Sequence, residues 1–433
     1  MKEPEKQDSA GPWRGAISRR NLLRGAAALG VAASVPEAFG QQIPPTGAPF
    51  GTIWLYISTY TSTTPSAFGN NGQGIYLCQL DLFTGQLTVL GLAASAAATP
   101  PTSLSSPSTI ALDPSRTHLY AGNEFGPPGA VSAFSIDRPT GALTPLNQQP
   151  TVGAPAYVGV DQNSKYLFSA EYTGGHFEVF PIMGDGSLGP AVFQQSDAAN
   201  DKVQHAVNAP PGSFAISAHE VTSTGHPHMM QTDPSNKWVL GADAGQDLIY
   251  VWKLTPGAMT PLTAATPASV NVPQDTPNSG DGPRHFAFHP NGRWMYSIQE
   301  EASTIIFWHF NSGTGTLSQQ QMVSSLPPGF AGTNFTSEIR VSPDGRFVYG
   351  ANRTNDTIGV FRIEPDGTLS QVSHASTLGD YPRIFTIDPL GLFAVVGNQR
   401  ADNVTTFKIT GNSLKFTGNY TPVGSPSGMV FLY

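Results

Sequence analysis

The side chains best suited to chemistry in this chain stand at the ends of short apolar runs. The segment Gly282–Tyr296 sets Arg284 and His285 directly before alternating apolar residues. His228 and Arg383 hold the same place before two other runs of this kind. An arginine at the mouth of a buried strand can bind an anion, and a histidine there can accept or donate a proton. Whether these residues can act together depends on the elements that carry them.

The apolar runs belong to units of one repeated pattern. Each unit has an alternating apolar run, a turn of the Asp-Pro-x-Gly kind and a second apolar run that ends in small and polar residues. In most units a third run and a further short strand follow, and four strands per unit are typical of a propeller blade. Six such units are marked at their turns by Asp113, Asp161, Asp233, His289, Ser342 and Asp388.

The two ends of the chain supply a seventh unit. The N-terminal runs IWLYISTYTS and GIYLCQLDLFTGQLTVLG provide a second, third and fourth strand, whereas the C-terminal run PSGMVFLY resembles a first strand alone. Pairing of the N-terminal strands with the C-terminal strand would close the ring and remove exposed sheet edges. The predicted fold class is therefore all-β, a seven-bladed β-propeller formed by residues 41–433 as one domain.

The residues before this domain have the pattern of an export signal. Arg19 and Arg20 are paired ahead of the weakly apolar run Gly25–Val35, which is too short to span a bilayer as a permanent helix. Residues 1–40 are thus predicted to be a twin-arginine signal peptide, cleaved near Gly40 and recognised by the Tat export machinery. We expect a periplasmic or secreted protein without stable membrane insertion.

The composition argues against a nucleic-acid partner and against an internal disulfide bond. The 433 residues carry a formal net charge of −8, with no cluster of Lys and Arg outside the N-terminus. No nucleic-acid partner is expected, because such partners need a basic face. The single cysteine, Cys78, cannot form an internal disulfide, and it lies in the alternating run Ile75–Leu80. We expect it to be a packed apolar residue.

The repeat brings separated polar residues to one face of the ring. Strands one and two of a blade are antiparallel, so the start of the first and the end of the second lie together, opposite the turn. Aligning the units makes His228, Arg284 and Arg383 equivalent at three strand entrances, with Arg340 deeper inside its strand. A funnel of acids, arginines and a histidine suits an anionic or hydroxylated small molecule, although part of this polarity would serve structure alone. The residues predicted to bind substrate are Glu124, Glu171, Asp243, Arg353 and Arg383.

Three motifs give the chain a resemblance to a known family: GHPH at 225–228, GPRH at 282–285 and SEIRVSPDGRFVY at 337–349. With YISTYTS near the N-terminus, they resemble the seven-bladed propeller lactonase family, which includes bacterial 6-phosphogluconolactonase and fungal carboxymuconate cyclase. The resemblance covers nearly all of residues 41–433. It implies a catalytic set of His228, Arg284, Glu300 and Arg340.

The implied reaction is the opening of a lactone by activated water. It needs a base for the water and positive donors where the ring and carbonyl oxygens become negative. Glu300 or His228 could supply the base, with Glu300 preferred, while Arg284 and Arg340 could clamp a carboxylate or stabilise the oxyanion. The family also implies an alternative enzyme, one similar to a muconate cycloisomerase.

No cofactor is expected, and no residue is assigned as a metal ligand. His226 and His228 could suggest a metal pair, but Pro227 between them fixes an extended path on which the two imidazoles would diverge. Binding of calcium or magnesium by loop carboxylates such as Asp243 is an alternative that the sequence leaves open.

Export bears on the substrate, because phosphogluconate metabolism is cytosolic. An exported lactonase that opens a sugar-derived or related lactone therefore fits better than a housekeeping 6-phosphogluconolactonase. Its expected small-molecule partner is a lactone or a sugar acid. The alternative is a non-catalytic propeller that binds a carbohydrate, peptide or protein partner in the envelope. The two hypotheses differ in whether His228, Arg284, Glu300 and Arg340 meet within one pocket.

Overall fold

A computed structural model describes residues 46–61, 69–97, 104–125, 129–196, 225–272 and 281–433. The proposed signal peptide, residues 1–40, lies outside the described residues. Every regular element in the described part is a β-strand. That part contains no helix with the length and apolar character needed to cross a membrane.

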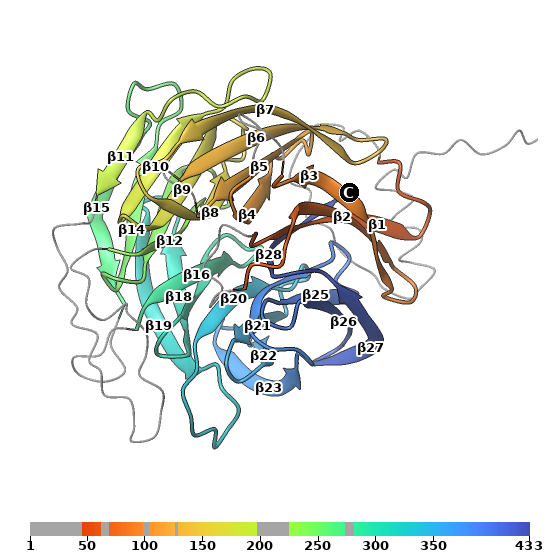
Figure 1. Ribbon diagram of the computed structural model, residues 1–433. Coiled ribbons are helices and arrows are strands. Elements are labelled where there is room, and N and C mark those ends of the chain that lie inside the picture. The colour runs from red at the N-terminus through yellow and green to blue at the C-terminus, as the bar shows by residue number, and fades with distance from the viewer. Residues whose placement is uncertain (1–45, 62–68, 98–103, 126–128, 197–224, 273–280) are drawn as a thin grey trace, which may run out of the picture.

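Seven four-stranded antiparallel sheets stand around a common axis, as the blades of a propeller do (Figure 1). The predicted fold class is confirmed. Blades 1 to 4 consist of β28 (Pro426–Leu432), β1 (Thr52–Thr59), β2 (Gly74–Asp81) and β3 (Leu87–Ser95); β4 (Pro107–Leu112), β5 (His118–Asn123), β6 (Ala130–Asp137) and β7 (Ala142–Pro150); β8 (Ala154–Val160), β9 (Tyr166–Thr173), β10 (His176–Pro181) and β11 (Phe193–Ser196); and β12 (Pro227–Thr232), β13 (Trp238–Asp243), β14 (Leu248–Leu254) and β15 (Leu262–Asn271). Blades 5 to 7 consist of β16 (Pro283–Phe288), β17 (Trp294–Gln299), β18 (Thr304–Asn311) and β19 (Thr316–Ser324); β20 (Thr336–Val341), β21 (Phe347–Asn352), β22 (Thr357–Ile363) and β23 (Leu369–Ser376); and β24 (Pro382–Ile387), β25 (Phe393–Asn398), β26 (Asn403–Thr410) and β27 (Ser413–Pro422).

Blade 1 closes the ring as its sequence predicts. Its inner strand, β28, comes from the C-terminal run and pairs antiparallel with β1, so that Trp54 lies opposite Leu432 and Tyr56 opposite Val430. β1 pairs on its other side with β2. The first described strand of the chain is therefore an interior strand that needs the last one as its neighbour.

The repeated aspartates hold the turns between the first two strands of a blade. One carboxylate oxygen of Asp233 accepts hydrogen bonds from the backbone N–H groups of Lys237 (2.9 Å) and Trp238 (2.8 Å). Asp388 binds the N–H of Leu392 in the same way, at 2.7 Å. In blade 6, where serine replaces the aspartate, the Ser342 hydroxyl accepts the corresponding bonds. A short polar side chain at this position thus satisfies backbone donors that the turn leaves free.

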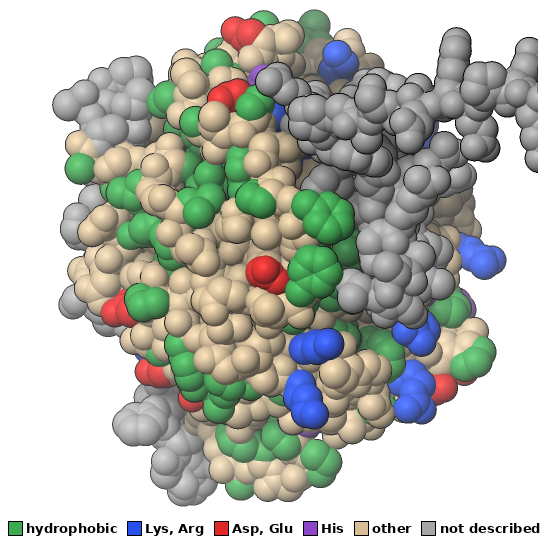
Figure 2. Space-filling model, turned by 90° about the vertical axis from the view of Figure 1, so that its right-hand side faces the viewer, with side chains coloured by type: hydrophobic (Ala, Val, Ile, Leu, Met, Phe, Trp, Pro, Cys, Tyr) green, Lys and Arg blue, Asp and Glu red, His purple; other side chains and the backbone are tan. Residues whose placement is uncertain are grey.

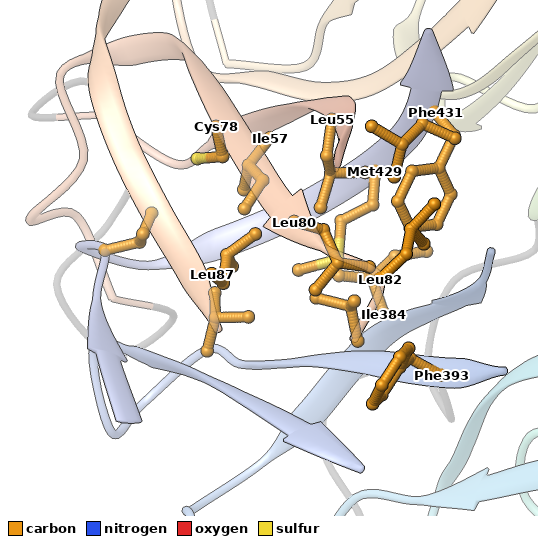
Figure 3. Packing of buried hydrophobic residues seen from close by; sticks show 14 of the residues in the cluster. Leu55, Ile57, Cys78, Leu80, Leu82, Leu87, Ile384, Phe393, Met429 and Phe431 are labelled. Carbon is orange, nitrogen blue, oxygen red and sulfur yellow. The ribbon is translucent and has the colours of Figure 1, made fainter. Parts of the chain in front are cut away.

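Each gap between neighbouring blades has its own apolar core, and the described residues form seven such clusters. Figure 3 shows the cluster that joins blade 1 to blade 7, where Leu55 and Met429 face Ile384 and Phe393. Cys78 is fully buried in it, as expected, and burial raises the pKa of its thiol to about 12. The side of the molecule in Figure 2 carries mostly uncharged side chains and presents no continuous basic surface.

Candidate active site

The innermost strand of each blade begins with a register shift. In blade 4, Pro227 pairs with Asp243 and Met229 with Ala242, which leaves His228 between them as a bulged residue. Proline has no N–H to leave unpaired, so it fits the start of this strand, and a bulge turns a side chain away from the regular alternation. The bulged residues of blades 1 to 7 are Ser427, Ser108, Ala156, His228, Arg284, the pair Ser337 and Glu338, and Arg383.

These bulges divide the channel mouth into a polar half and a small half. Blades 4 to 7 contribute the imidazole, the guanidinium groups and a carboxylate, whereas blades 1 to 3 contribute only Ser427, Ser108 and Ala156. A central cavity of about 210 Å³ is lined by members of both halves, Arg284 and Arg383 among them. Ser108, Ala156 and Ser427 line this space on one side, and Arg284, Glu338 and Arg383 line it on the other.

Glu300 is the centre of the charged group in the polar half. Its Oε1 accepts a hydrogen bond from Nη2 of Arg353, and its Oε2 lies 3.3 Å from Nε of Arg284. Nε2 of His228 is 4.0 Å from the same Oε2. All four side chains are buried. We call Glu300, Arg284, Arg353 and His228 the Glu300 cluster.

The ends of the second strands bring Glu300 and Arg353 to this place. Each residue directly follows such a strand, β17 and β21, and its backbone N–H binds a carbonyl close to the start of its blade's first strand. The N–H of Glu300 donates to the Gly282 carbonyl at 2.6 Å, and that of Arg353 to the Phe335 carbonyl at 2.7 Å. The Arg353 guanidinium also lies 5.2 Å from the ring centre of Tyr381. These backbone hydrogen bonds help to place the charged side chains of Glu300 and Arg353 beside each other.

Burial and neighbouring charge set the protonation states in the cluster. Burial lowers the pKa of Arg284 to about 9, against the opposing effect of Glu300, so the guanidinium stays charged at neutral pH. Burial, together with the Arg284 charge, holds the pKa of His228 well below its ordinary 6.5, so this imidazole is neutral. For Arg353 the effect of burial is outweighed by Glu300, which raises its pKa. Two cations and one carboxylate give the cluster a net positive charge suited to an anion.

A second polar group lies in blades 1, 2 and 7. The Tyr60 hydroxyl donates to Oε2 of Glu124 at 2.6 Å, and Nη2 of Arg383 lies 3.9 Å from the same oxygen. The Arg383 guanidinium lies 5.0 Å from the centre of the Tyr60 ring. Glu124 and Arg383, both predicted to bind substrate, are therefore neighbours. Tyr60 was not among the residues predicted to bind substrate, although it directly follows the second strand of its blade as Glu300 follows another.

Arg340 does not join the Glu300 cluster. Its Nε lies 3.5 Å from Oε1 of Glu338, whose other oxygen is 3.2 Å from Nδ1 of His285. That imidazole in turn lies 3.4 Å from Nη1 of Arg284. Two residues therefore separate Arg340 from Arg284, and the guanidiniums beside Glu300 are those of Arg284 and Arg353. Neither His285 nor Glu338 was assigned a catalytic or substrate-binding role from the sequence, although His285 stands beside Arg284 in GPRH.

Two of the residues predicted to bind substrate, Asp243 and Glu171, lie outside the Glu300 cluster and outside the second polar group. Oδ1 of Asp243 accepts the N–H groups of His226 (2.7 Å) and Gly245 (2.9 Å), so this carboxylate supports a loop. Glu171 accepts the N–H of Gly153 at 2.6 Å and lies beside Glu178. Burial, and then the Glu178 carboxyl, raise the pKa of Glu171 to about 10. Their contacts give these two acids structural roles within their own blades.

The two histidines of the GHPH motif contact the same tyrosine, Tyr172, in different ways. Nδ1 of His226 donates to the Tyr172 carbonyl at 3.0 Å, and the two rings stack 4.5 Å apart. His228 meets the same tyrosine ring edge-on. Among the described residues, no group of three or more His, Cys, Asp or Glu side chains is arranged to hold a metal ion.

Comparison with known proteins adds independent information. A family model described as lactonase, 7-bladed beta-propeller, matches residues 54–431. A 6-phosphogluconolactonase of Bacillus subtilis is 33% identical over 355 residues, which are 82% of this chain and 90% of that relative. One of Pectobacterium carotovorum is 28% identical over 314 residues, 72% of this chain and 82% of its own. The solved structure of a periplasmic gluconolactonase of Pseudomonas aeruginosa aligns with a TM-score of 0.75 at 28% identity, covering 88% of this chain and 99% of that one.

Proposed function

Because the chain belongs to the seven-bladed β-propeller lactonase family, we propose that it hydrolyses a sugar-derived lactone at the Glu300 cluster. The observation that carries this proposal is the buried group of two guanidiniums, a carboxylate and a neutral imidazole, next to a channel half lined by small residues. Such a site offers a base, donors for a developing negative charge and room for a compact ring.

His228 serves as the base in this proposal. Both oxygens of Glu300 are already held by guanidiniums, so a proton could bind there only by weakening two ion pairs. His228 is neutral and has a free lone pair at one ring nitrogen. It accepts a proton from water as the water oxygen attacks the lactone carbonyl carbon. Glu300, 4.0 Å away, stabilises the imidazolium that forms.

Arg284 stabilises the tetrahedral oxyanion, and the ring then opens. As the carbonyl re-forms, the bond to the ring oxygen breaks, and that oxygen takes the proton back from the imidazolium of His228. The product is a hydroxy acid. Arg383 and Glu124, on neighbouring blades, offer one cation and one acceptor for the hydroxyl groups of a sugar-derived ring.

We propose that the protein is exported and that this reaction takes place outside the cytoplasm. Arg19 and Arg20 form the paired arginines of the proposed signal, and one related structure is that of a periplasmic gluconolactonase. Replacing both arginines by lysine should leave the precursor in the cytoplasm, because the guanidinium pair is the recognised feature. Cell fractionation and immunoblotting measure this. Normal delivery of the double variant to the envelope would refute the export proposal.

A substrate screen tests the reaction itself. Residues 41–433 are incubated with aldonolactones, phosphorylated lactones and acyl-homoserine lactones, and proton release is compared with the rate without enzyme. We expect aldonolactones to be opened. Arg284→Ala should lose about 2–4 kcal/mol of transition-state stabilisation, the scale for one such donor. Arg346→Ala is the matched control, since Arg346 is exposed and its ion-pair partner among the described residues, Asp344, lies at the surface with it.

A second variant separates catalysis from folding. Arg284 is buried against Glu300, so alanine there also removes an ion-pair partner and should lower the melting temperature. Arg284→Lys keeps the charge but loses the planar fork that binds an oxyanion. We expect it to lose turnover with a melting temperature near that of the parent. Ligand binding without turnover of any lactone by the parent would favour the non-catalytic propeller instead.

A further inference from the structure

A second cavity lies at the other end of the channel, at the face where the Asp-Pro-x-Gly turns are. Its volume is about 410 Å³. It shares Gln231 and Arg340 with the central cavity, so the two spaces meet at these side chains. We call it the turn-face cavity; its polar lining consists chiefly of Arg116, Gln162, Gln231, Arg340 and Thr386.

Arg340 is a partly neutralised cation at the junction of the two cavities. Its side chain is 41% exposed, and its ion-pair partner among the described residues is Glu338, at 3.5 Å. Glu338 is shared with His285, and despite burial the Arg340 and His285 neighbours lower its pKa to about 2. The Nε of Arg340 has no hydrogen-bond acceptor in the described part of the chain. The guanidinium thus keeps donors for a further acceptor.

The rim of the turn-face cavity carries a second cation. The guanidinium carbon of Arg116 lies 3.6 Å from the centre of the Tyr433 ring, which fixes the side chain over an aromatic face. The acid on this rim, Asp113, is occupied, because its Oδ1 accepts the N–H groups of Thr117 and His118, both at 2.8 Å. Arg340 and Arg116 thus bring two guanidiniums to the lining of this cavity.

We propose that the turn-face cavity binds a small oxyanion, a carboxylate or a phosphate, through Arg340 and Arg116. A guanidinium presents parallel N–H donors that match the spacing of two such oxygens. Gln162 and Gln231 supply amide groups for the remaining oxygens or hydroxyls. This site is separate from the Glu300 cluster, which lies at the opposite end of the channel, and it gives Arg340 a binding role away from Glu300.

Two sources of the oxyanion fit this chemistry. One is free inorganic phosphate. The other is the ring-opened acid of the proposed hydrolysis, a reading that rests on the proposed function. The cavity's amides and hydroxyl favour the acid, because a polyhydroxy chain would use them and a phosphate would not need them all.

Titration calorimetry on residues 41–433 tests the site with two probes, inorganic phosphate and gluconate. We expect saturable binding of at least one probe, with Arg340→Gln weakening it about tenfold, a loss of one charged contact. Arg346→Gln, which alters an exposed arginine of the same blade, should leave the affinity unchanged. Tighter binding of gluconate identifies the acid as the ligand, and tighter binding of phosphate identifies the free ion.

Further measurements keep the outcome decisive. Arg340→Gln leaves Glu338 with one partner fewer, so Arg116→Gln, at the rim, provides a second variant that should weaken binding in the same way. Crystals soaked in selenate should show an anomalous peak in the turn-face cavity of the parent and none in Arg340→Gln. Binding that survives both substitutions, a peak only at Arg284 or Arg383, or no binding of either probe would overturn the proposal. None of these results depends on whether a lactone is hydrolysed.

Discussion

Glu300 holds two buried guanidiniums at once, and this makes it the most consequential single residue of the site. Removing one partner of a buried ion pair is costly because the remaining charge loses both its attraction and its solvent. Arg284 and Arg353 would both be left in this state. The stability of the channel mouth and its proposed chemistry therefore depend on the same carboxylate.

We expect Glu300→Gln to lower the free energy of unfolding by about 3–5 kcal/mol, the range for breaking a buried pair. Urea denaturation followed by tryptophan fluorescence measures this. Asp344→Asn is the matched control, because it breaks the exposed pair with Arg346 and should cost less than about 1 kcal/mol. Equal losses for the two variants would show that the Glu300 pairs are not buried as described.

The protonation state of His228 predicts a pH dependence. Its pKa lies well below 6.5 in the folded protein because of burial and Arg284. As the base, it must be neutral, so kcat/KM should be full at pH 7 and fall only as the pH drops below 6.5 through that lowered pKa. A pH–rate profile on the best lactone checks this, with His228→Gln as the control that should abolish the acidic limb together with the activity. A limb centred at or above 6.5 would contradict it.

Part of the site follows from sequence and part does not. His228, Arg284 and Arg383 are equivalent because each follows a proline at a strand entrance, and that pattern can be read directly. Arg340 was expected deeper than the strand entrances, and strand geometry gives the reason. Residues two apart in a strand share a face but lie about 6.6 Å apart along it, so Arg340 sits a full step further down the channel than Glu338, while Arg353 comes from another strand end.

At the scale of the element, blade 3 carries an acid pair that no cation neutralises among the contacts described. Glu171 and Glu178 lie side by side, both buried, and burial with this proximity raises the pKa of Glu171 from 4.5 to about 10. A group whose pKa is raised on folding stabilises the fold below its unfolded pKa, and that contribution is lost as the pH rises. Blade 3 should therefore weaken between about pH 4.5 and pH 10.

Glu171→Gln should remove this loss. The amide oxygen can still accept the N–H of Gly153, and its NH₂ group can donate to Glu178 as a protonated acid would. We expect the variant to melt a few degrees above the parent at pH 8, where each 1 kcal/mol is worth about 2–4 °C, and the difference to vanish near pH 4.5. Calorimetric scans across this range measure it. Lower stability of the variant at pH 8 would show that the ionised pair is favourable.

The strands and turns of a blade were predictable because their signals are local. A carboxylate that caps the turn, as Asp233 does, and alternating apolar residues on either side specify a hairpin without reference to the rest of the molecule. The bulge at a strand entrance has no such local signature apart from the proline that precedes it in six of the seven blades; in blade 6 the strand begins with Thr336. It depends on how the strand meets its neighbours in the ring, so sequence could indicate the entrance and its face but not which side chains contact one another there.

At the scale of the whole molecule, ring closure concentrates stability in a short C-terminal segment. β28 pairs with β1, and Met429, Phe431 and Leu432 fill the cores on either side of blade 1. Deleting residues 428–433 should cost at least about 5 kcal/mol, since each such side chain contributes about 1.5–3 kcal/mol by burial. The urea midpoint measures this, with removal of Tyr433 alone as the control. An unchanged midpoint for the longer deletion would rule out the closure.

The same arrangement has a temporal consequence during synthesis. β1 leaves the ribosome before any other described strand, yet its inner edge stays without a partner until residues 426–432 emerge. Blades 2 to 7 can form one after another, each on its predecessor, but the nascent chain stays an open arc throughout translation. Its exposed edge and its half-built first core are surfaces that chaperones recognise and that favour aggregation. Maturation of this propeller is therefore timed by completion of its polypeptide rather than by growth of any one blade.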